Sequence, residues 1–172
     1  MLLIPQPTND VCTLVPMFLC SANTINYPLV VFGLFAAGLR ASLANSAYTP
    51  RELLHQYRDS SSKLVFCHAD LVDTVMQMFQ IAGINEREAR RRIVVADHKL
   101  KTKAPKGFLS VENLLSKGTL KEEEKFDGPL SHETTLLCYS SGTTGKPKGV
   151  EVGNHLSLIS NSLWLRSALD YP

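Results

Sequence analysis

Short apolar runs alternate with helical segments along most of this chain, and this alternation is the strongest constraint on its fold. The runs Lys63–Cys67 and Ile93–Ala96 are each typical of a buried strand. Between them, apolar side chains recur at helical spacing and predict a helix over Asp70–Ala82 with Gly83 as its C-cap. Strands separated by helices favour an α/β fold, in which a largely parallel sheet carries helices on both faces.

A capping box marks the start of another helix. Thr49 is suited to cap a helix that begins at Pro50, and Glu52 stands three positions after the cap, where its carboxylate can reach back to the cap backbone. This pattern predicts a helix over Pro50–Asp59. Other helices are predicted over Leu29–Leu39, Val111–Lys117 and His155–Leu169. Strands are predicted at Leu136–Tyr139 and Gly149–Val152, and other short apolar segments lie at Val11–Cys20 and Ala41–Asn45.

Length and composition exclude several classes of protein. The chain has 172 residues, of which 44% are hydrophobic and 20% charged, so it is one domain or part of a larger one. This apolar content excludes disorder as the default, and the composition also excludes collagen, coiled coils and disulfide knots. The net charge of +2 gives no support to nucleic-acid binding. The stretch Arg87–Lys106 is basic, but an apolar strand divides it and no aromatic residue interleaves, which favours a solvated surface over a nucleic-acid patch.

One stretch, between Asp10 and Arg40, has no charged residue. Polar residues and Pro28 divide it into halves that are each shorter than the roughly 20 residues of a membrane span, so a buried strand followed by a buried helix explains it better. The cysteines lack the CxxC spacing and sit in apolar runs, which indicates free thiols in a reducing compartment: Cys12, Cys20, Cys67 and Cys138. Met1–Ile4 lacks the cationic start of a signal peptide, so we expect an intracellular protein that is not secreted.

Residues 139–152 (YSSGTTGKPKGVEV) carry the chemistry of this sequence. The segment directly follows the predicted strand, and ligands of open parallel sheets sit beyond the carboxyl ends of strands. Its glycines let the backbone turn N–H groups toward an anion, its hydroxyl residues supply short donors and its lysines supply mobile positive charge. No acid stands between Ser140 and Val150, so the segment suits a polyphosphate. The residues with these roles are Gly142, Gly145, Gly149, Ser140, Ser141, Thr143, Thr144, Lys146 and Lys148.

The phosphate-binding loops of two better-known families do not match this segment. Pro147 follows Gly145-Lys146 where Ser or Thr is required, and only two residues separate Gly142 from Gly145, so the Walker pattern of P-loop kinases and NTPases fails. The GxGxxG fingerprint of dinucleotide-binding folds also fails. The sequence has no GxSxG elbow for an esterase, and the adjacent pair Cys67-His68 lacks the spacing of metal ligands.

The string YSSGTTGKPKGV resembles the phosphate-loop signature of the adenylate-forming superfamily, which includes acyl-CoA synthetases, 4-coumarate–CoA ligases, luciferases and peptide-synthetase adenylation domains. Upstream, residues 23–28 and the later strings AAG and AYTPREL resemble the acyl- and coumarate–CoA ligase branch. The resemblance covers about residues 18–172, which we expect to form part of the AMP-binding N-terminal domain of such an enzyme. Residues 1–17 fit poorly and are interpreted as an atypical start.

The resemblance implies a ligase with two half-reactions. A carboxylate attacks the α-phosphate of ATP to give an acyl-adenylate and pyrophosphate, and a thiol, often that of coenzyme A, then displaces AMP. The groups for magnesium, ribose, adenylate formation and the carboxylate lie downstream in relatives, so we expect no catalytic or metal-ligating residue here and no activity of this chain alone. The residues that the resemblance assigns to the phosphates of ATP are Ser140, Ser141, Gly142, Thr143, Thr144 and Lys148, whereas Lys146 stands where relatives vary.

Two hypotheses follow. In the first, the chain is an N-terminal piece of an ATP-dependent acyl- or aryl-CoA synthetase, cytoplasmic or peroxisomal, whose partners are ATP and a carboxylic acid rather than nucleic acid or a membrane. In the second, it is a nucleotide-binding remnant or an interaction module without activity. The chain stops at Pro172 in mid-pattern, which favours the first hypothesis. If the chain is made alone, the helices over Leu29–Leu39 and Leu156–Leu169 would lack partners, and we expect poor stability.

Overall fold

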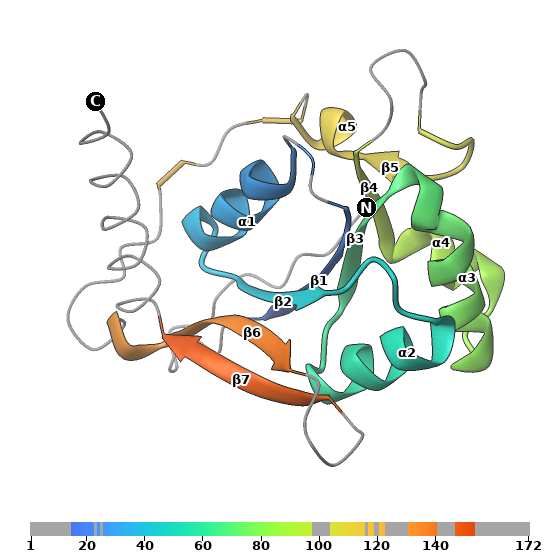
Figure 1. Ribbon diagram of the computed structural model, residues 1–172. Coiled ribbons are helices and arrows are strands. Elements are labelled where there is room, and N and C mark those ends of the chain that lie inside the picture. Colours follow the sequence, from blue (N-terminus) through green and yellow to red (C-terminus); the bar gives the residue numbers. More distant parts are fainter. Residues whose placement is uncertain are drawn as a thin grey trace, which may run out of the picture.

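The computed structural model describes residues 15–22, 24, 26–97, 104–115, 117–118, 121–122, 131–140 and 147–153. Over these residues, the strands form one sheet with the order β5-β4-β3-β1-β2-β6-β7 (Figure 1). The strands are β1 (Pro16–Cys20), β2 (Arg40–Ala44), β3 (Leu64–His68), β4 (Ile93–Asp97), β5 (Leu109–Ser110), β6 (Thr134–Ser140) and β7 (Lys148–Gly153). The helices are α1 (Asn26–Ala36), α2 (Pro50–Asp59), α3 (Val72–Ile81), α4 (Glu86–Arg91) and α5 (Val111–Leu115), and the 3-10 turn η1 (Ala69–Leu71) precedes α3.

All the described strands except β7 run parallel. β1 pairs with β2 and β3, β2 pairs with β6, and β4 pairs with β3 and β5, whereas β7 pairs antiparallel with β6. The predicted α/β fold with a largely parallel sheet is therefore confirmed. The sequence predicts a strand at Gly149–Val152. An apolar pattern is the same for parallel and antiparallel strands, so the pattern does not give the direction of this strand. Only the short connection from β6 favours the antiparallel direction.

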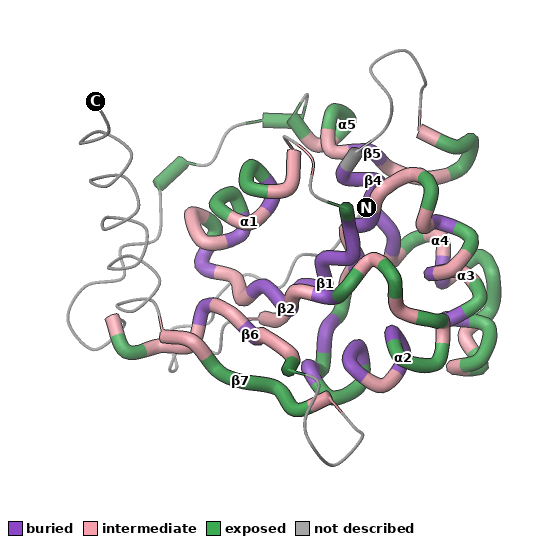
Figure 2. The backbone as a smooth tube through the Cα atoms, viewed as in Figure 1, coloured by how far each residue is buried: buried purple, intermediate pink, exposed green. Residues whose placement is uncertain are grey.

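Helices cover both faces of the sheet (Figure 1). Because side chains alternate along a strand, β1 sends Phe18 and Cys20 to one face and Met17 and Leu19 to the other. On the first face, which we call the α2 face, these strand residues pack against α2, α3 and α4. On the second, the α1 face, they pack against α1 and α5. Burial is concentrated in the central strands (Figure 2), so β1 is the middle of two cores.

The capping box at the start of α2 is confirmed. The Thr49 hydroxyl accepts a hydrogen bond from the backbone N–H of Glu52 at 3.4 Å, and the Glu52 carboxylate accepts the backbone N–H of Thr49 at 2.8 Å. The Glu52 carboxylate also accepts the Thr49 hydroxyl at 2.7 Å. These hydrogen bonds lower the pKa of Glu52, since they favour its charged form.

Three helices end on a residue in the left-handed region of the backbone map. These residues are Gly38 after α1, with φ 66°, Ser61 after α2, with φ 53°, and Gly83 after α3, with φ 77°. The C-cap of α3 is Ala82, one residue before the predicted Gly83, and Gly83 takes the left-handed conformation that ends the helix. In each case the next N–H reaches back to a carbonyl in the last turn of the helix: Leu39 to Leu34, Ser62 to Tyr57 and Ile84 to Phe79. Ser61 is the exception in this group, because it carries a Cβ into a conformation that favours glycine.

The structure adds the helix α4, which the sequence pattern does not predict, and it places the strand expected within Val11–Cys20 at Pro16–Cys20. The helix α4 begins where the Asn85 side chain accepts the N–H of Glu88 at 3.0 Å, and it is too short to show an apolar stripe. Pro16 and Met17, which fall in the segment interpreted as an atypical start, are the first residues of the central strand β1. The helix predicted over His155–Leu169 lies outside the described residues.

The thiols of Cys20 and Cys67 stand directly opposite each other on β1 and β3, and both are buried and free. Cys138 on β6 is also free, and Cys12 lies outside the described residues. Within the described ranges, no helix has the length and apolarity that crossing a bilayer requires.

Candidate functional site

The segment with the predicted phosphate-binding residues connects β6 to β7. Ser140 is the last residue of β6 and Lys148 is the first residue of β7, and the two are paired directly opposite each other in the antiparallel ladder. Both residues are exposed. Two candidates eight positions apart in sequence are thus brought together at the base of the connection. The other four candidates, Ser141, Gly142, Thr143 and Thr144, lie outside the described residues, as does Lys146.

The connection begins at the carboxyl end of a parallel strand. β6 runs parallel to β2, and β2 runs parallel to β1, so Ser140 lies at the same edge of the sheet as Ala44 and Cys20, the last residues of those strands. Ligands of open α/β sheets bind at this edge, because loops there are free to vary while the strands hold their ends in place. We expect the ligand-binding loop at the end of a strand, and Ser140 and Lys148 lie there.

The two faces of the β6–β7 ladder carry different side chains at this end. Leu136 packs into the core of the α1 face, so the alternation along β6 puts Ser140 on the same face. Directly opposed residues of an antiparallel pair share a face, and Lys148 therefore lies on the α1 face beside Ser140. Tyr139 and its partner Gly149 occupy the α2 face. A hydroxyl and an ammonium thus adjoin on one face, where they can bind a single anion.

Tyr139 reaches from β6 to the end of α2. Its hydroxyl donates a hydrogen bond to Oδ2 of Asp59, the last residue of that helix, at 2.6 Å. Burial raises the pKa of Tyr139, and the hydrogen bond and negative charge of Asp59 raise this pKa further. The phenol therefore stays protonated at neutral pH and keeps its role as donor.

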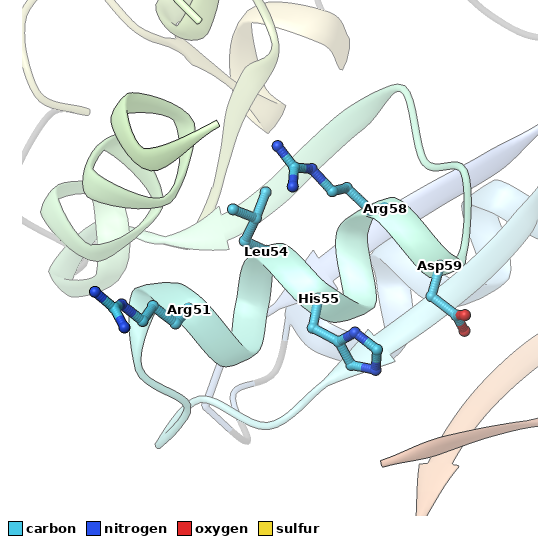
Figure 3. A pocket seen from close by; sticks show the side chains of 5 residues that line it. All are labelled: Arg51, Leu54, His55, Arg58 and Asp59. Atoms are coloured by element: carbon cyan, nitrogen blue, oxygen red, sulfur yellow. The ribbon is translucent and has the colours of Figure 1, made fainter. Parts of the chain in front are cut away.

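Asp59 also belongs to an open hollow of about 510 Å³ along the exposed side of α2. Figure 3 shows that the side chains around this hollow diverge: Arg51 and Arg58 point away from His55, and Asp59 points toward the β6–β7 hairpin. Because these groups do not converge on one point, the hollow has no ready-made binding geometry. Its lining residues are Arg51, Leu54, His55, Arg58 and Asp59.

The buried thiols do not form a nucleophilic or metal-binding site. Burial raises the pKa of Cys20 to about 12 and raises that of Cys67 as well, so both remain protonated at neutral pH. His68 uses its Nδ1 to accept the backbone N–H of Asp70 at 3.2 Å, and it thereby caps the turn after β3. Among the described residues, no group of three or more His, Cys, Asp or Glu side chains is arranged to hold a metal ion.

The basic stretch that begins at Arg87 is partly neutralised by its own helix. Arg90 pairs with Glu86 at 2.7 Å, and Arg92 pairs with Glu88 at 2.9 Å. The Arg90 guanidinium also lies over the Phe108 ring, 4.7 Å from its centre. These two arginines therefore act within the fold, which supports the interpretation of the stretch as a solvated surface.

Sequence reasoning finds Ser140 and Lys148 through the local pattern, but it gives no role to Tyr139 or Asp59. These two residues stand 80 positions apart. Neither belongs to a pattern that points to the other, so only the packing of α2 against the sheet reveals the contact. The one local signal is Gly149, whose missing side chain leaves space for a large neighbour.

Comparison with known proteins agrees with the resemblance found in the sequence and with the fold. The sequence model of the AMP-binding enzyme family matches residues 15–170. A probable CoA ligase, CCL5 of Humulus lupulus, is 32% identical over 149 residues, which are 84% of this chain and 24% of that protein. The 4-coumarate–CoA ligase-like protein 8 of Arabidopsis thaliana is 31% identical over 145 residues, or 82% of this chain and 24% of that protein.

A solved structure agrees at the level of the fold. A long-chain-fatty-acid–CoA ligase from Archaeoglobus fulgidus superimposes with a TM-score of 0.66 and 24% sequence identity, covering 88% of this chain and 27% of that one. The chain thus spans about a quarter of the length of these similar proteins.

Proposed function

The chain belongs to the family of AMP-binding enzymes, and from this premise we propose that it supplies the ATP phosphate loop of an acid–thiol ligase. The reaction would be the ATP-dependent activation of a carboxylic acid to an acyl-adenylate and then to a CoA thioester. The curated relatives whose names include CoA ligase and 4-coumarate–CoA ligase support this class of reaction. An intracellular location, cytoplasmic or peroxisomal, is part of the proposal, and the unlinked thiols of Cys20 and Cys67 support it.

The pairing of Ser140 with Lys148 carries the proposal. A hydroxyl donor and an ammonium lie side by side, both exposed, at the edge of the sheet where ligands of such folds bind. The triphosphate of ATP needs both kinds of group, because its oxygens accept hydrogen bonds and carry negative charge. We infer that Ser141, Gly142, Thr143 and Thr144 complete the phosphate contacts between these two ends.

Each half-reaction exchanges one bond for another. In the first, a carboxylate oxygen forms a bond to the α-phosphorus of ATP, and the bond from that phosphorus to the pyrophosphate leaving group breaks. In the second, the thiol loses its proton to the solvent and its sulfur bonds to the acyl carbon, while the bond from that carbon to the phosphate oxygen breaks and AMP leaves with the electron pair. Both steps require charge to be neutralised from several sides at once, so the loop contributes binding and orientation of the phosphates rather than the whole reaction.

The proposal is tested by Lys148→Ala in the full-length protein, with carboxylate-dependent ATP–pyrophosphate exchange as the assay. Loss of the ammonium should raise the KM for ATP about tenfold or more, since a charge-assisted contact to phosphate is removed. Lys117→Ala is the matched control, because Lys117 is an exposed lysine that follows α5, near β5 at the other end of the sheet. The control should leave the KM for ATP unchanged.

Two outcomes would count against the proposal. Unchanged ATP–pyrophosphate exchange in the Lys148→Ala variant would show that Lys148 does not bind the phosphates. Absence of exchange in the wild type with every acid tested, together with retained ATP binding, would favour the second hypothesis of a nucleotide-binding remnant.

A further inference from the structure

Asp59 and Tyr139 join the end of a helix to the end of the strand that leads into the phosphate loop. Asp59 closes α2, Tyr139 is the next-to-last residue of β6, and their side chains meet at 2.6 Å. The bond is short and its acceptor carries a charge, so it belongs to the stronger class of hydrogen bonds. It ties the last turn of α2 to the strand one residue before Ser140.

Gly149 allows this contact. Tyr139 and Gly149 are directly opposed in the ladder, and a Cβ on Gly149 would lie only 3.2 Å from both Cζ and Oη of Tyr139. Such an approach is closer than most real contacts of a Cβ, so with a side chain at this position the phenol would have to shift by a few tenths of an ångström. The absence of a side chain at Gly149 therefore leaves room for the ring in the position from which its hydroxyl reaches Asp59.

The strand β7 is held weakly by the sheet alone. It lies at the edge of the sheet and pairs only with β6 in the described sheet. Its residues Lys148–Glu151 are all exposed, so the sheet core contributes little to holding this end of the strand. On the α2 face, the Tyr139 ring lies over Gly149 and its hydroxyl is bonded to Asp59 of α2, and these contacts restrain the base of the loop.

We propose that Asp59, Tyr139 and Gly149 form a brace whose function is to position Ser140 and Lys148 for the phosphates of the nucleotide. The three are positioning residues, because they lie on the α2 face while Ser140 and Lys148 lie on the α1 face. This inference rests on the proposed function, since it assigns the brace to the same phosphate site. It predicts that loss of the brace raises the KM for ATP, while kcat and the stability of the fold change less.

Three single variants and one double variant of the full-length protein test the brace through its hydrogen bond. Tyr139→Phe and Asp59→Ala each remove the bond and should raise the KM for ATP about fivefold, with kcat changed less than twofold. Asp59→Asn keeps an acceptor oxygen at Oδ1 and should restore the KM to within about twofold of the wild type. The double variant Tyr139→Phe/Asp59→Ala should be no worse than either single variant, because both act on one contact.

Tyr57→Phe is the matched control. Tyr57 belongs to α2 itself and donates its hydroxyl to the backbone carbonyl of Lys63 at 3.4 Å, inside the core of the α2 face. Its loss should lower stability without changing the KM for ATP. A merely structural role of Tyr139 predicts the same behaviour for both tyrosine variants, so a KM that rises only in Tyr139→Phe supports the brace.

The outcomes separate the brace from the proposed function. If wild-type exchange is normal and Lys148→Ala is impaired, but Tyr139→Phe and Asp59→Ala keep the wild-type KM for ATP, the brace is overturned and the phosphate loop stands. If the wild type shows no exchange, the proposed function falls, and with it the role of the brace in nucleotide binding. Amide hydrogen exchange of a peptide spanning 139–149 then still tests the contact. Faster exchange in Tyr139→Phe but not in Tyr57→Phe would show that the contact restrains this segment. Equal exchange rates in the two variants would show that it does not.

Discussion

The two faces of the sheet differ in how completely their covering helices are buried. On the α2 face, the rings of Phe18, Tyr57 and Phe79 meet edge to face, with ring centres 5.8 and 5.4 Å apart, inside a fully buried cluster. On the α1 face, the helix α1 buries Val30 and Leu34 but leaves apolar side chains on its outer side. Leu29 is 65% exposed and Phe32 is 53% exposed.

This difference shows where the stability of the chain comes from. α2 is amphipathic, with buried and charged sides, whereas α1 is apolar all round (NYPLVVFGLFA). An apolar outer side contributes nothing to folding while it faces water, so the α2 face supplies most of the stabilising core. The exposure of α1 is what the sequence analysis expects of the helix predicted over Leu29–Leu39.

The largest effect should come from the two cores. Phe79→Ala removes a fully buried ring from the α2 face and should lower the free energy of unfolding by about 3–5 kcal/mol. Leu34→Ala on the α1 face should cost about 2–3 kcal/mol, because the open outer side of α1 lets the helix adjust to the cavity. Urea unfolding followed by circular dichroism measures both. Equal losses would remove the distinction between the faces.

A smaller effect should come from the helix ends, which use the same turn on both faces with different residues. Gly38→Ala after α1 should destabilise the chain by about 1–2 kcal/mol, since it places a Cβ in the left-handed region. Ser61→Gly after α2 should stabilise it by about 0.5–1 kcal/mol, for the opposite reason. Thermal unfolding midpoints report both shifts. A loss of stability in Ser61→Gly would show that the serine side chain contributes more than its backbone strain costs.

The smallest effect should be the pH dependence of the cap of α2. The pKa of Glu52 is lowered in the folded chain, so its carboxylate stabilises α2 above the ordinary value of 4.5, and this contribution is lost as the pH falls below it. Glu52→Gln should therefore reduce the decrease in urea midpoint between pH 6 and pH 3.5. Thr49→Ala removes the donor and should act in the same direction. An unchanged pH profile in both variants would exclude the cap as a source of acid sensitivity.

Local sequence patterns predicted much of the fold and part of the site. The strand over Lys63–Cys67 is shifted by one residue in the structure, and the helix over Pro50–Asp59 has the predicted bounds, because each depends on neighbouring residues only. Ser140 and Lys148 could be predicted as candidates for the same reason. Their direct pairing across the ladder required the direction of β7, which a single apolar pattern does not contain.

The contact between Asp59 and Tyr139 shows what such patterns miss. It depends on α2 crossing from β2 to β3 over the sheet, so that its last residue lies over the end of β6. No periodicity, cap or turn in the sequence encodes that meeting. Long-range polar pairs of this kind are properties of the packed fold.

The hairpin between β6 and β7 has a consequence for how this loop can change in evolution or by design. Parallel strands need a crossover, so altering a connection that contains α1, α2, α3 or α5 means moving a helix. Here the chain leaves the sheet at Ser140 and re-enters beside it at Lys148, whatever lies between. Doubling the length of such a connection costs only about 0.6 kcal/mol of closure entropy. Insertions and deletions in this loop should therefore change the free energy of folding very little, so selection for nucleotide binding alone can set its length.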